Sequence, residues 1–155
     1  MAIARKLRNY LDEHAVHYHV LSHPEEFTAP EVAHALHVPG RMMAKTVLVK
    51  ADGRPVLAAV SANTRLDLSA LRMVLGASIV ELASEKEIDR SFPDCETGAM
   101  PPFGNVYGLP VVVDSGLVTD AAFVFEGGTH HEAIVLSFPD FERLVHPQVA
   151  DIGLH

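Results

Sequence analysis

Hydrophobic and polar positions follow two different periods along this chain, and the changes of period mark the expected elements. A helical period of three and four residues joins Ile3, Leu7, Tyr10 and Leu11, with charged residues on the other face. The pattern predicts four further helices: FTAPEVAHALHVPG (27–40), LSALRMVLG after Asp67, a segment from Ser84 to near Pro93, and FPDFERLV (138–145). Thr28 with Glu31, and Ser84 with Glu87, have the spacing of a capping box.

Seven segments show the alternation or the short apolar runs of strands. They are VHYHVLSH (16–23), AKTVLVK (44–50), PVLAAV (55–60), ASIVEL (77–82), LPVVVD (109–114), AAFVFE (121–126) and EAIVLS (132–137). Asp52-Gly53 and Gly127-Gly128 are expected to form tight turns between strands. Interspersed helices and closely joined strands predict an α+β fold. We expect a single domain over residues 1–155, with helices packed against a mixed, partly antiparallel, curled sheet.

The composition favours a globular domain of ordinary size. The chain has 155 residues, of which 48% are hydrophobic, and its apolar runs are strand-sized, far short of a membrane span. The first residues are charged and lack the apolar core of a signal peptide. Cys95 is the only cysteine, which excludes an intramolecular disulfide and a thiolate zinc cluster. We therefore expect a cytoplasmic protein without a membrane partner.

The formal net charge of −8 argues against general nucleic-acid binding, and no DNA partner is expected. The charge is uneven, because residues 91–155 contain nine acidic residues and a single basic one, Arg143. An anionic partner should therefore meet the N-terminal third. The basic residues there include Arg5, Lys6, Arg8, Arg41, Lys45 and Lys50. Ordinary solvated surface charges are the alternative explanation.

The ten histidines suggest a metal site, but their spacing does not support one. His14, His17, His19 and His23 cluster in the sequence, and His130-His131 precede Glu132, yet neither HExxH nor CxxC is present. We expect no metal and no cofactor; a metal-dependent hydrolase built on the histidines is an alternative. GxSxG, P-loop and GxGxxG motifs are also missing. Any catalysis should thus depend on positioning and backbone dipoles.

Two segments are candidates for such chemistry. Lys45 lies at the start of an apolar strand, where it points either to solvent or into a cleft that holds phosphate or carboxylate oxygens. The loop GAMPPFG (98–104) places two prolines between two glycines, so its backbone should be shaped rather than flexible. It either turns a corner or aims its N–H groups at a ligand.

AKTVLV, GAMPPFG and GGTHHEAIVLSFPDFERL, in this order, resemble the YbaK/EbsC family. These aminoacyl-tRNA deacylases are related to the editing insertion of bacterial prolyl-tRNA synthetases, and the resemblance extends from the first helix to about Pro147. It implies a free-standing hydrolase that removes a wrong small amino acid, such as Ala or Cys, from tRNA for proline. The implied partners are the acceptor end of aminoacyl-tRNA and a prolyl-tRNA synthetase.

The resemblance also implies the site. Catalytic residues would be Lys45, Gly98, Ala99, Met100 and Pro102, and substrate-binding residues would be Thr46, Ser61, Gly128, Thr129 and His130. Thr129 replaces a serine that is frequent in the family, which adds a methyl group to the pocket. The free ribose hydroxyl of the substrate would accept the proton, so that no protein base is required. The alternative is a non-catalytic module that binds an acceptor end or a nucleotide.

Overall fold

The strands divide among three sheets in the computed structural model, which describes residues 3–119 and 121–154. The sheets have the orders β5-β2-β3-β6-β9, β1-β8-β7 and β10-β4. The strands are β1 (Tyr18–Ser22), β2 (Ala44–Ala51), β3 (Arg54–Ser61), β4 (Arg65–Leu66), β5 (Val80–Leu82), β6 (Val111–Asp114), β7 (Ala122–Thr129), β8 (Glu132–Ser137), β9 (Gln148–Ala150) and β10 (Gly153–Leu154). The predicted α+β class is confirmed. The predicted range 1–155 includes residues 1–2, 120 and 155, which lie outside the described residues.

Five α-helices are present in the described part of the chain, and each was predicted. They are α1 (Arg5–Glu13), α2 (Ala29–Ala35), α3 (Leu68–Leu75), α4 (Glu85–Ser91) and α5 (Phe138–Val145), with short 3₁₀ turns η1 (Gly40–Met42), η2 (Gly104–Tyr107) and η3 (Ser115–Leu117). The capping box of α4 is complete, since Ser84 Oγ accepts the Glu87 N–H and Glu87 Oε1 accepts the Ser84 N–H.

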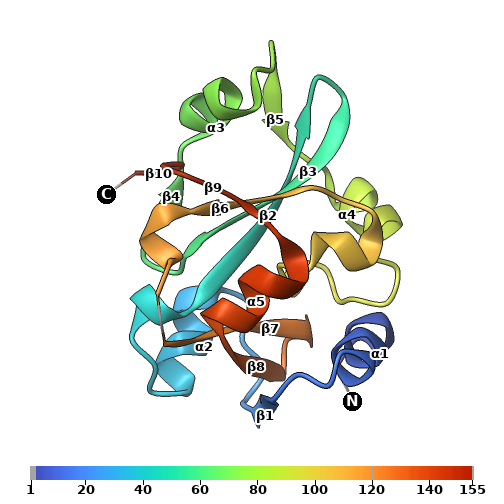
Figure 1. The fold of residues 1–155 in the computed structure, drawn as a ribbon, viewed down its shortest axis with the longest axis vertical. Helices are drawn as coiled ribbons and strands as arrows, with labels where there is room; N and C mark the ends of the chain where they lie inside the picture. Colours follow the sequence, from blue (N-terminus) through green and yellow to red (C-terminus); the bar gives the residue numbers. More distant parts are fainter. Residues whose placement is uncertain (1–2, 120, 155) are drawn as a thin grey trace.

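The five-stranded sheet is mixed because two kinds of connection build it. β2 and β3 form an antiparallel hairpin, which turns at Asp52 and Gly53, both with positive φ. β3, β6 and β9 pair in parallel, so the chain leaves the sheet between them and returns. Figure 1 shows the long hairpin rising through the molecule, with α3 beside its upper end and β1, β7 and β8 below.

One isolated bridge joins the two larger sheets. Met43, just before β2, pairs in parallel with Val124 of β7. Beside this junction lies the main core, where the aromatic rings of Phe103, Phe123, Phe125 and Phe141 pack with centroids 4.9–5.5 Å apart. The loop that contains GAMPPFG is thus anchored by Phe103 to the strands of the three-stranded sheet.

Three predictions about elements need correction. Gly127-Gly128 is not the turn, because β7 continues through both glycines and the chain turns at His130-His131. The helix predicted over 27–40 covers only Ala29–Ala35, and His37 beyond it has positive φ. The strand expected over 77–82 is limited to Val80–Leu82. The short strands β4, β9 and β10 were not predicted at all.

No helix in the described part of the chain combines the length and the apolar character that a membrane crossing requires.

Candidate functional site

A ladder of backbone hydrogen bonds fixes the loop before Pro101 against the end of β7. The Glu96 N–H donates to the Gly128 carbonyl at 2.7 Å, and the Gly128 N–H donates to the Ala99 carbonyl at 2.8 Å. Within the loop, the Ala99 N–H donates to the Glu96 carbonyl at 3.0 Å. The loop is therefore held like an added strand, which explains how an irregular segment keeps one shape.

The glycines of the site serve two different purposes. Gly98 has a φ of +89°, which favours glycine, and a Cβ there would lie 3.6 Å from His130 Cε1, in ordinary contact. Gly128 has a φ of +105°, and a Cβ there would lie 2.7 Å from the Cβ of Ala4. Gly128 is thus required by the close approach of the N-terminal segment. Both of its backbone polar groups are bonded to the loop, so it can act on a ligand only through the loop.

The loop presents two backbone donors. Among the described residues, the N–H groups of Gly98 and Met100 have no hydrogen-bond partner. The Ala99 N–H is already used, which differs from the expectation that it is available to a ligand. Pro101 and Pro102 are buried and have no N–H, so they restrict the backbone next to these donors. The loop is open to solvent at Gly98.

His130 lies behind Gly98 at the β7–β8 turn and is buried. Its Nε2 is 2.8 Å from the Thr97 carbonyl, and its Nδ1 is 3.1 Å from the Glu26 carbonyl. Its backbone N–H donates to Glu96 Oε1 at 2.6 Å. The buried Glu126 carboxyl has Oε1 at 3.8 Å from the His130 Nδ1. Burial, and secondly the negative charge of Glu96, raise the pKa of Glu126 to about 8.

Thr129, which precedes His130, is also buried. Its side-chain oxygen accepts the His131 N–H at 3.3 Å. This bond is local to the turn, and it stabilises the place where β7 passes into β8. The hydroxyl expected to bind substrate therefore has a partner within the protein.

Lys45 lies on β2, half-buried, on the sheet face that it shares with Val47 and Val60. Burial, and secondly the positive charge of Arg65, lower the pKa of Lys45. No carboxylate among the described residues lies within ion-pair distance of its Nζ. The side chain is therefore an unpaired, partly desolvated cation.

The other two residues expected on these strands face away from Lys45. Thr46 follows Lys45 in β2 and so points to the opposite face of the sheet, together with Ala44. Ser61 pairs with Ala44, and its buried Oγ lies 2.7 Å from Thr64 Oγ1. Thr46 and Ser61 thus share a face, and Lys45 occupies the other one.

The beginning of β2 is related to the loop through β7. The bridge from Met43 to Val124 places the beginning of β2 beside β7, whose far end bears Thr129 and His130. No hydrogen bond or ion pair between described residues joins Lys45 to the segment 98–102. The loop and the β7–β8 turn therefore form one cluster, and Lys45 is a separate feature.

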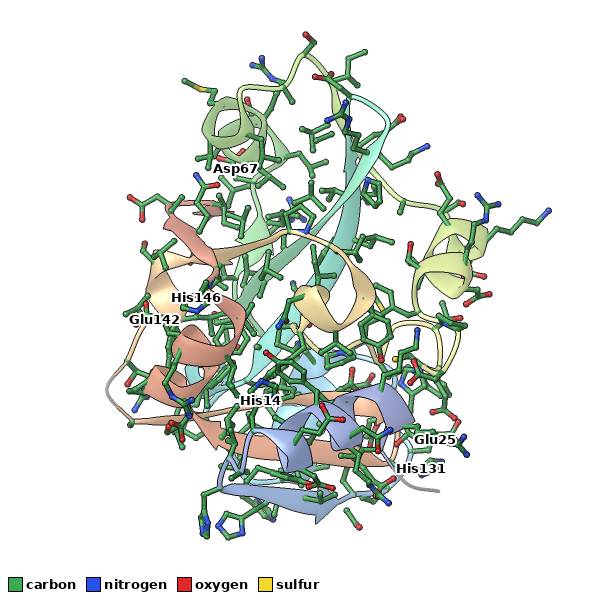
Figure 2. The ribbon with its side chains drawn as sticks, turned by 45° about the vertical axis from the view of Figure 1, so that its right-hand side comes forward. His14, Glu25, Asp67, His131, Glu142 and His146 are labelled. Carbon is green, nitrogen blue, oxygen red and sulfur yellow. The ribbon has the colours of Figure 1, made fainter. Side chains whose placement is uncertain are left out.

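The N-terminal histidines are dispersed. The rings of His17 and His19 lie 5.6 Å apart, whereas His14 and His23 bond to nearby backbone carbonyls. His131 Nε2 lies 3.3 Å from Glu25 Oε2, and the two side chains form a pair (Figure 2). Within residues 3–119 and 121–154, no group of three or more His, Cys, Asp or Glu residues is arranged to hold a metal ion.

Cys95 is poorly placed to act as a nucleophile. Burial raises the pKa of its thiol to about 12. Its Sγ contacts the Tyr107 hydroxyl at 3.5 Å. Because the thiolate is the reactive form, this side chain is inert near neutral pH.

Solved structures share this fold over nearly the whole chain. A protein proposed to be a trans-editing enzyme for prolyl tRNA synthetase is 25% identical, with a TM-score of 0.86 over 98% of this chain and 97% of its own. A protein described only as hypothetical is 20% identical, with a TM-score of 0.87 over 97% of this chain and 100% of its own, which shows the fold alone.

Curated relatives are much longer proteins. The proline–tRNA ligase of Bacillus cytotoxicus is 30% identical over 111 residues, which are 70% of this chain and 19% of the ligase. That of Nitratidesulfovibrio vulgaris is 35% identical over 105 residues, 65% of this chain and 17% of the ligase. The chain thus spans about a fifth of the length of these relatives.

The profile of the aminoacyl-tRNA editing domain matches residues 23–144, which begin just after β1, extend into α5 and include the loop, the β7–β8 turn and Lys45. With this match over most of its length, the chain belongs to the aminoacyl-tRNA editing domain family.

Proposed function

We propose that this protein is a hydrolase that deacylates mischarged aminoacyl-tRNA. The observation that carries the proposal is the fixed loop with two backbone donors that have no partner among the described residues, the N–H groups of the exposed Gly98 and the buried Met100. Membership of the editing-domain family supports an editing role. The loop supplies what ester hydrolysis needs most, which is a preorganised place for negative charge.

The chemistry requires little from side chains. An aminoacyl ester is already activated, so a positioned water can attack its carbonyl carbon. As the C–O bond to water forms, charge develops on the carbonyl oxygen, and a backbone N–H aimed at it contributes about 2.7–4 kcal/mol. The free ribose hydroxyl of the terminal adenosine accepts the proton of the water. That hydroxyl passes a proton to the neighbouring ester oxygen as the bond between this oxygen and the carbonyl carbon breaks, so the amino acid leaves as a free acid and the ribose regains its second hydroxyl.

Lys45 is proposed to hold a phosphate of the acceptor end. A partly desolvated lysine without a carboxylate partner attracts an anion more strongly than a solvated one. Its neighbour Arg65 adds positive charge of the same sign. A protein that contacts only the single-stranded acceptor end of a tRNA needs few positive side chains for its phosphates. Such binding is compatible with a net charge of −8 on the protein.

The substrate is proposed from the names of the relatives. Both curated proteins are proline–tRNA ligases, and one structural relative is proposed to edit for prolyl tRNA synthetase. We therefore propose tRNA for proline bearing a wrong small amino acid, such as Ala or Cys, with a prolyl-tRNA synthetase as the source of the error. Editing is useful there because one methylene separates substrates by only about 1–3 kcal/mol.

A deacylation screen tests this proposal. Purified protein is mixed with tRNA for proline charged with Ala, Cys, Ser or Thr, and release of the amino acid is measured. We expect release from at least one mischarged form and none from the correctly charged form. Tight binding without release from any of them would replace the hydrolase by the non-catalytic binding module.

A further inference from the structure

Helix α1 has its charges in the reverse of the usual order. Arg5, Lys6 and Arg8 are exposed and lie among its first four residues, whereas Asp12 and Glu13 lie at its other end. The N-terminal end of a helix carries partial positive charge, so cations there and carboxylates at the opposite end both lower stability. Of the other described helices, α2, α4 and α5 have an acidic residue in the first turn, and α3 has an aspartate cap. The charges of α1 therefore do not serve the fold.

The cations of α1 also lack ionic partners. No carboxylate among the described residues lies within ion-pair distance of Arg5, Lys6 or Arg8. Lys6 Nζ lies 5.4 Å from the centroid of the Tyr107 ring, so this lysine has a contact within the protein. Arg5 and Arg8 are three residues apart and share one face of the helix, where like charges repel each other. These two arginines therefore present two positive charges to solvent.

The start of α1 is fixed beside the loop that presents the backbone donors. The Ala4 N–H donates to the Gly127 carbonyl at 2.8 Å, and the next residue of β7 is bonded to the loop. In addition, Asp94 Oδ2 accepts the Lys6 N–H at 3.1 Å. Figure 1 shows α1 directly below the segment that follows α4. The arginines of α1 thus begin next to the backbone that holds the loop in place.

The acidic groups near α1 are bonded elsewhere. Asp94 accepts the Lys6 N–H and also the Tyr107 hydroxyl, the latter at 2.8 Å. Asp12, near the end of the helix, accepts the Tyr18 hydroxyl at 3.0 Å. Each carboxylate is thus held by a donor other than an arginine, and the two arginines remain open to an external anion.

The segment that contains the loop is too acidic to attract RNA. Residues 91–155 contain nine acidic residues and one basic residue, so an RNA strand that brings its 3′ end to the loop meets repulsion there. Each phosphate of RNA carries a negative charge, and arginine binds phosphate with paired N–H groups. Helix α1 comes from a different part of the chain and supplies two arginines beside the loop. Charge complementarity therefore favours an RNA backbone on this face.

We propose that Arg5 and Arg8 form a phosphate-binding surface on α1, which holds the sugar–phosphate backbone of the tRNA acceptor end. The proposal rests on the proposed function and deepens it, because it assigns a surface to the binding of the tRNA. Lys45 lies on β2, so α1 is a second phosphate contact on a different element. Contacts to the backbone contribute affinity and orientation, and they select no particular sequence.

Binding of uncharged tRNA for proline tests the surface without any turnover. Affinity is measured by fluorescence anisotropy over a series of KCl concentrations for wild type and for the double variant Arg5→Gln, Arg8→Gln. The matched control is Arg54→Gln, Arg72→Gln, which removes two exposed arginines from β3 and α3. The α1 variant should bind about tenfold more weakly, and the slope of log affinity against log salt should decrease by about 1.4, since each contact with a single strand accounts for about 0.7. The control should follow wild type.

Stability and kinetics separate a binding role from a structural one. Because the two arginines oppose the helix dipole and repel each other, the α1 variant should melt at or above the wild-type temperature. With mischarged tRNA its KM should rise about tenfold, and kcat should change little. A lower melting temperature with wild-type affinity for tRNA would mean that the arginines support the fold, and the proposal would be wrong.

The remaining outcomes distinguish this surface from the proposed function. Unchanged tRNA affinity in the folded α1 variant would overturn the surface, even in a protein that deacylates tRNA. Weaker tRNA binding by the variant, with no amino acid released by either protein, would support the surface and defeat the proposed deacylase. Purified prolyl-tRNA synthetase is the last probe. If the variant loses affinity for that protein and keeps its affinity for tRNA, the surface binds a protein and the proposal fails.

Discussion

Strand β2 bears a lysine near each end, and the two have opposite surroundings. Lys50 lies 3.0 Å from Glu87 and 3.5 Å from Glu81, and the hydrogen bond to Glu87 is the main reason why its pKa is raised. Lys45 has no carboxylate within ion-pair distance among the described residues, and burial lowers its pKa. The lysine at one end of the strand is therefore paired with carboxylates, and the lysine at the other end is unpaired.

This difference supports the proposal that the Lys45 end of β2 is the functional one. A paired surface lysine such as Lys50 ties α4 to the sheet and needs no further partner. An unpaired, partly buried cation lowers stability, so its presence calls for another reason. A hollow of about 730 Å³ lies at the other end of the strand, where Asp52, Leu75 and Pro110 line it. Charge and open donors, rather than volume, mark the proposed site.

Two glycines give the strongest test of this comparison. Gly98 and Gly53 both have positive φ, and both have room for a side chain without a clash. Valine should therefore strain the backbone and lower the melting temperature at either position. Only Gly98→Val should also reduce single-turnover deacylation, by about 100-fold, through displacement of a donor. Equal turnover in the two folded variants would show that the loop only turns a corner.

The two lysines of β2 should differ in their effect on activity. Lys45→Ala should lower kcat/KM by about 10- to 100-fold with an intact fold, because it removes an anion-binding charge. Lys45→Arg should recover only part of this loss, since the guanidinium is larger and planar. Lys50→Ala should leave deacylation at the wild-type rate. Steady-state kinetics measures deacylation by the three variants, and circular dichroism checks that each is folded. A fully active Lys45→Ala protein would remove Lys45 from the mechanism.

Two carboxyl groups, Glu126 on β7 and Glu87 beside Lys50, should respond oppositely to pH. Glu126 keeps its proton in the folded state up to about 8 and loses it near 4.5 when unfolded, so stability falls as pH rises between these values. Glu87 has a pKa lowered to about 2, first by its bond to the Ser84 N–H, so its contribution is present above 4.5 and lost as pH falls towards 2.

Melting temperatures against pH measure both effects. The advantage of Glu126→Gln over wild type should grow from acid to pH 8, and the deficit of Glu87→Gln should disappear in acid. Parallel curves for Glu126→Gln and wild type would mean that the buried carboxyl ionises normally.

Metal removal should have the smallest effect. The sequence lacks a zinc motif, and an aminoacyl ester hydrolyses readily with a positioned water. Activity should therefore survive exhaustive dialysis against a chelator, with the melting temperature unchanged. Loss of deacylation that zinc restores would require a metal-dependent mechanism instead.

Local sequence signals determined most of the elements. The caps at Thr28 and Ser84 and the turn at Asp52-Gly53 act through bonds between residues a few positions apart, so the sequence alone predicts them. The loop at Gly98 was recognisable for the same reason, since its glycines and prolines restrict their own backbone.

Tertiary structure decided what depends on distant segments. Gly127-Gly128 has the composition of a turn, but the approach of Ile3 to Gly127 and of Ala4 to Gly128 requires the glycines within a strand. β9 and β10 are too short to show a period, and their partners alone define them. The meeting of Glu126, Glu96 and His130 joins two regions about 30 positions apart in sequence. Nothing in the sequence near Glu126 indicates a buried carboxyl, because burial and neighbouring charge arise only when the chain is folded.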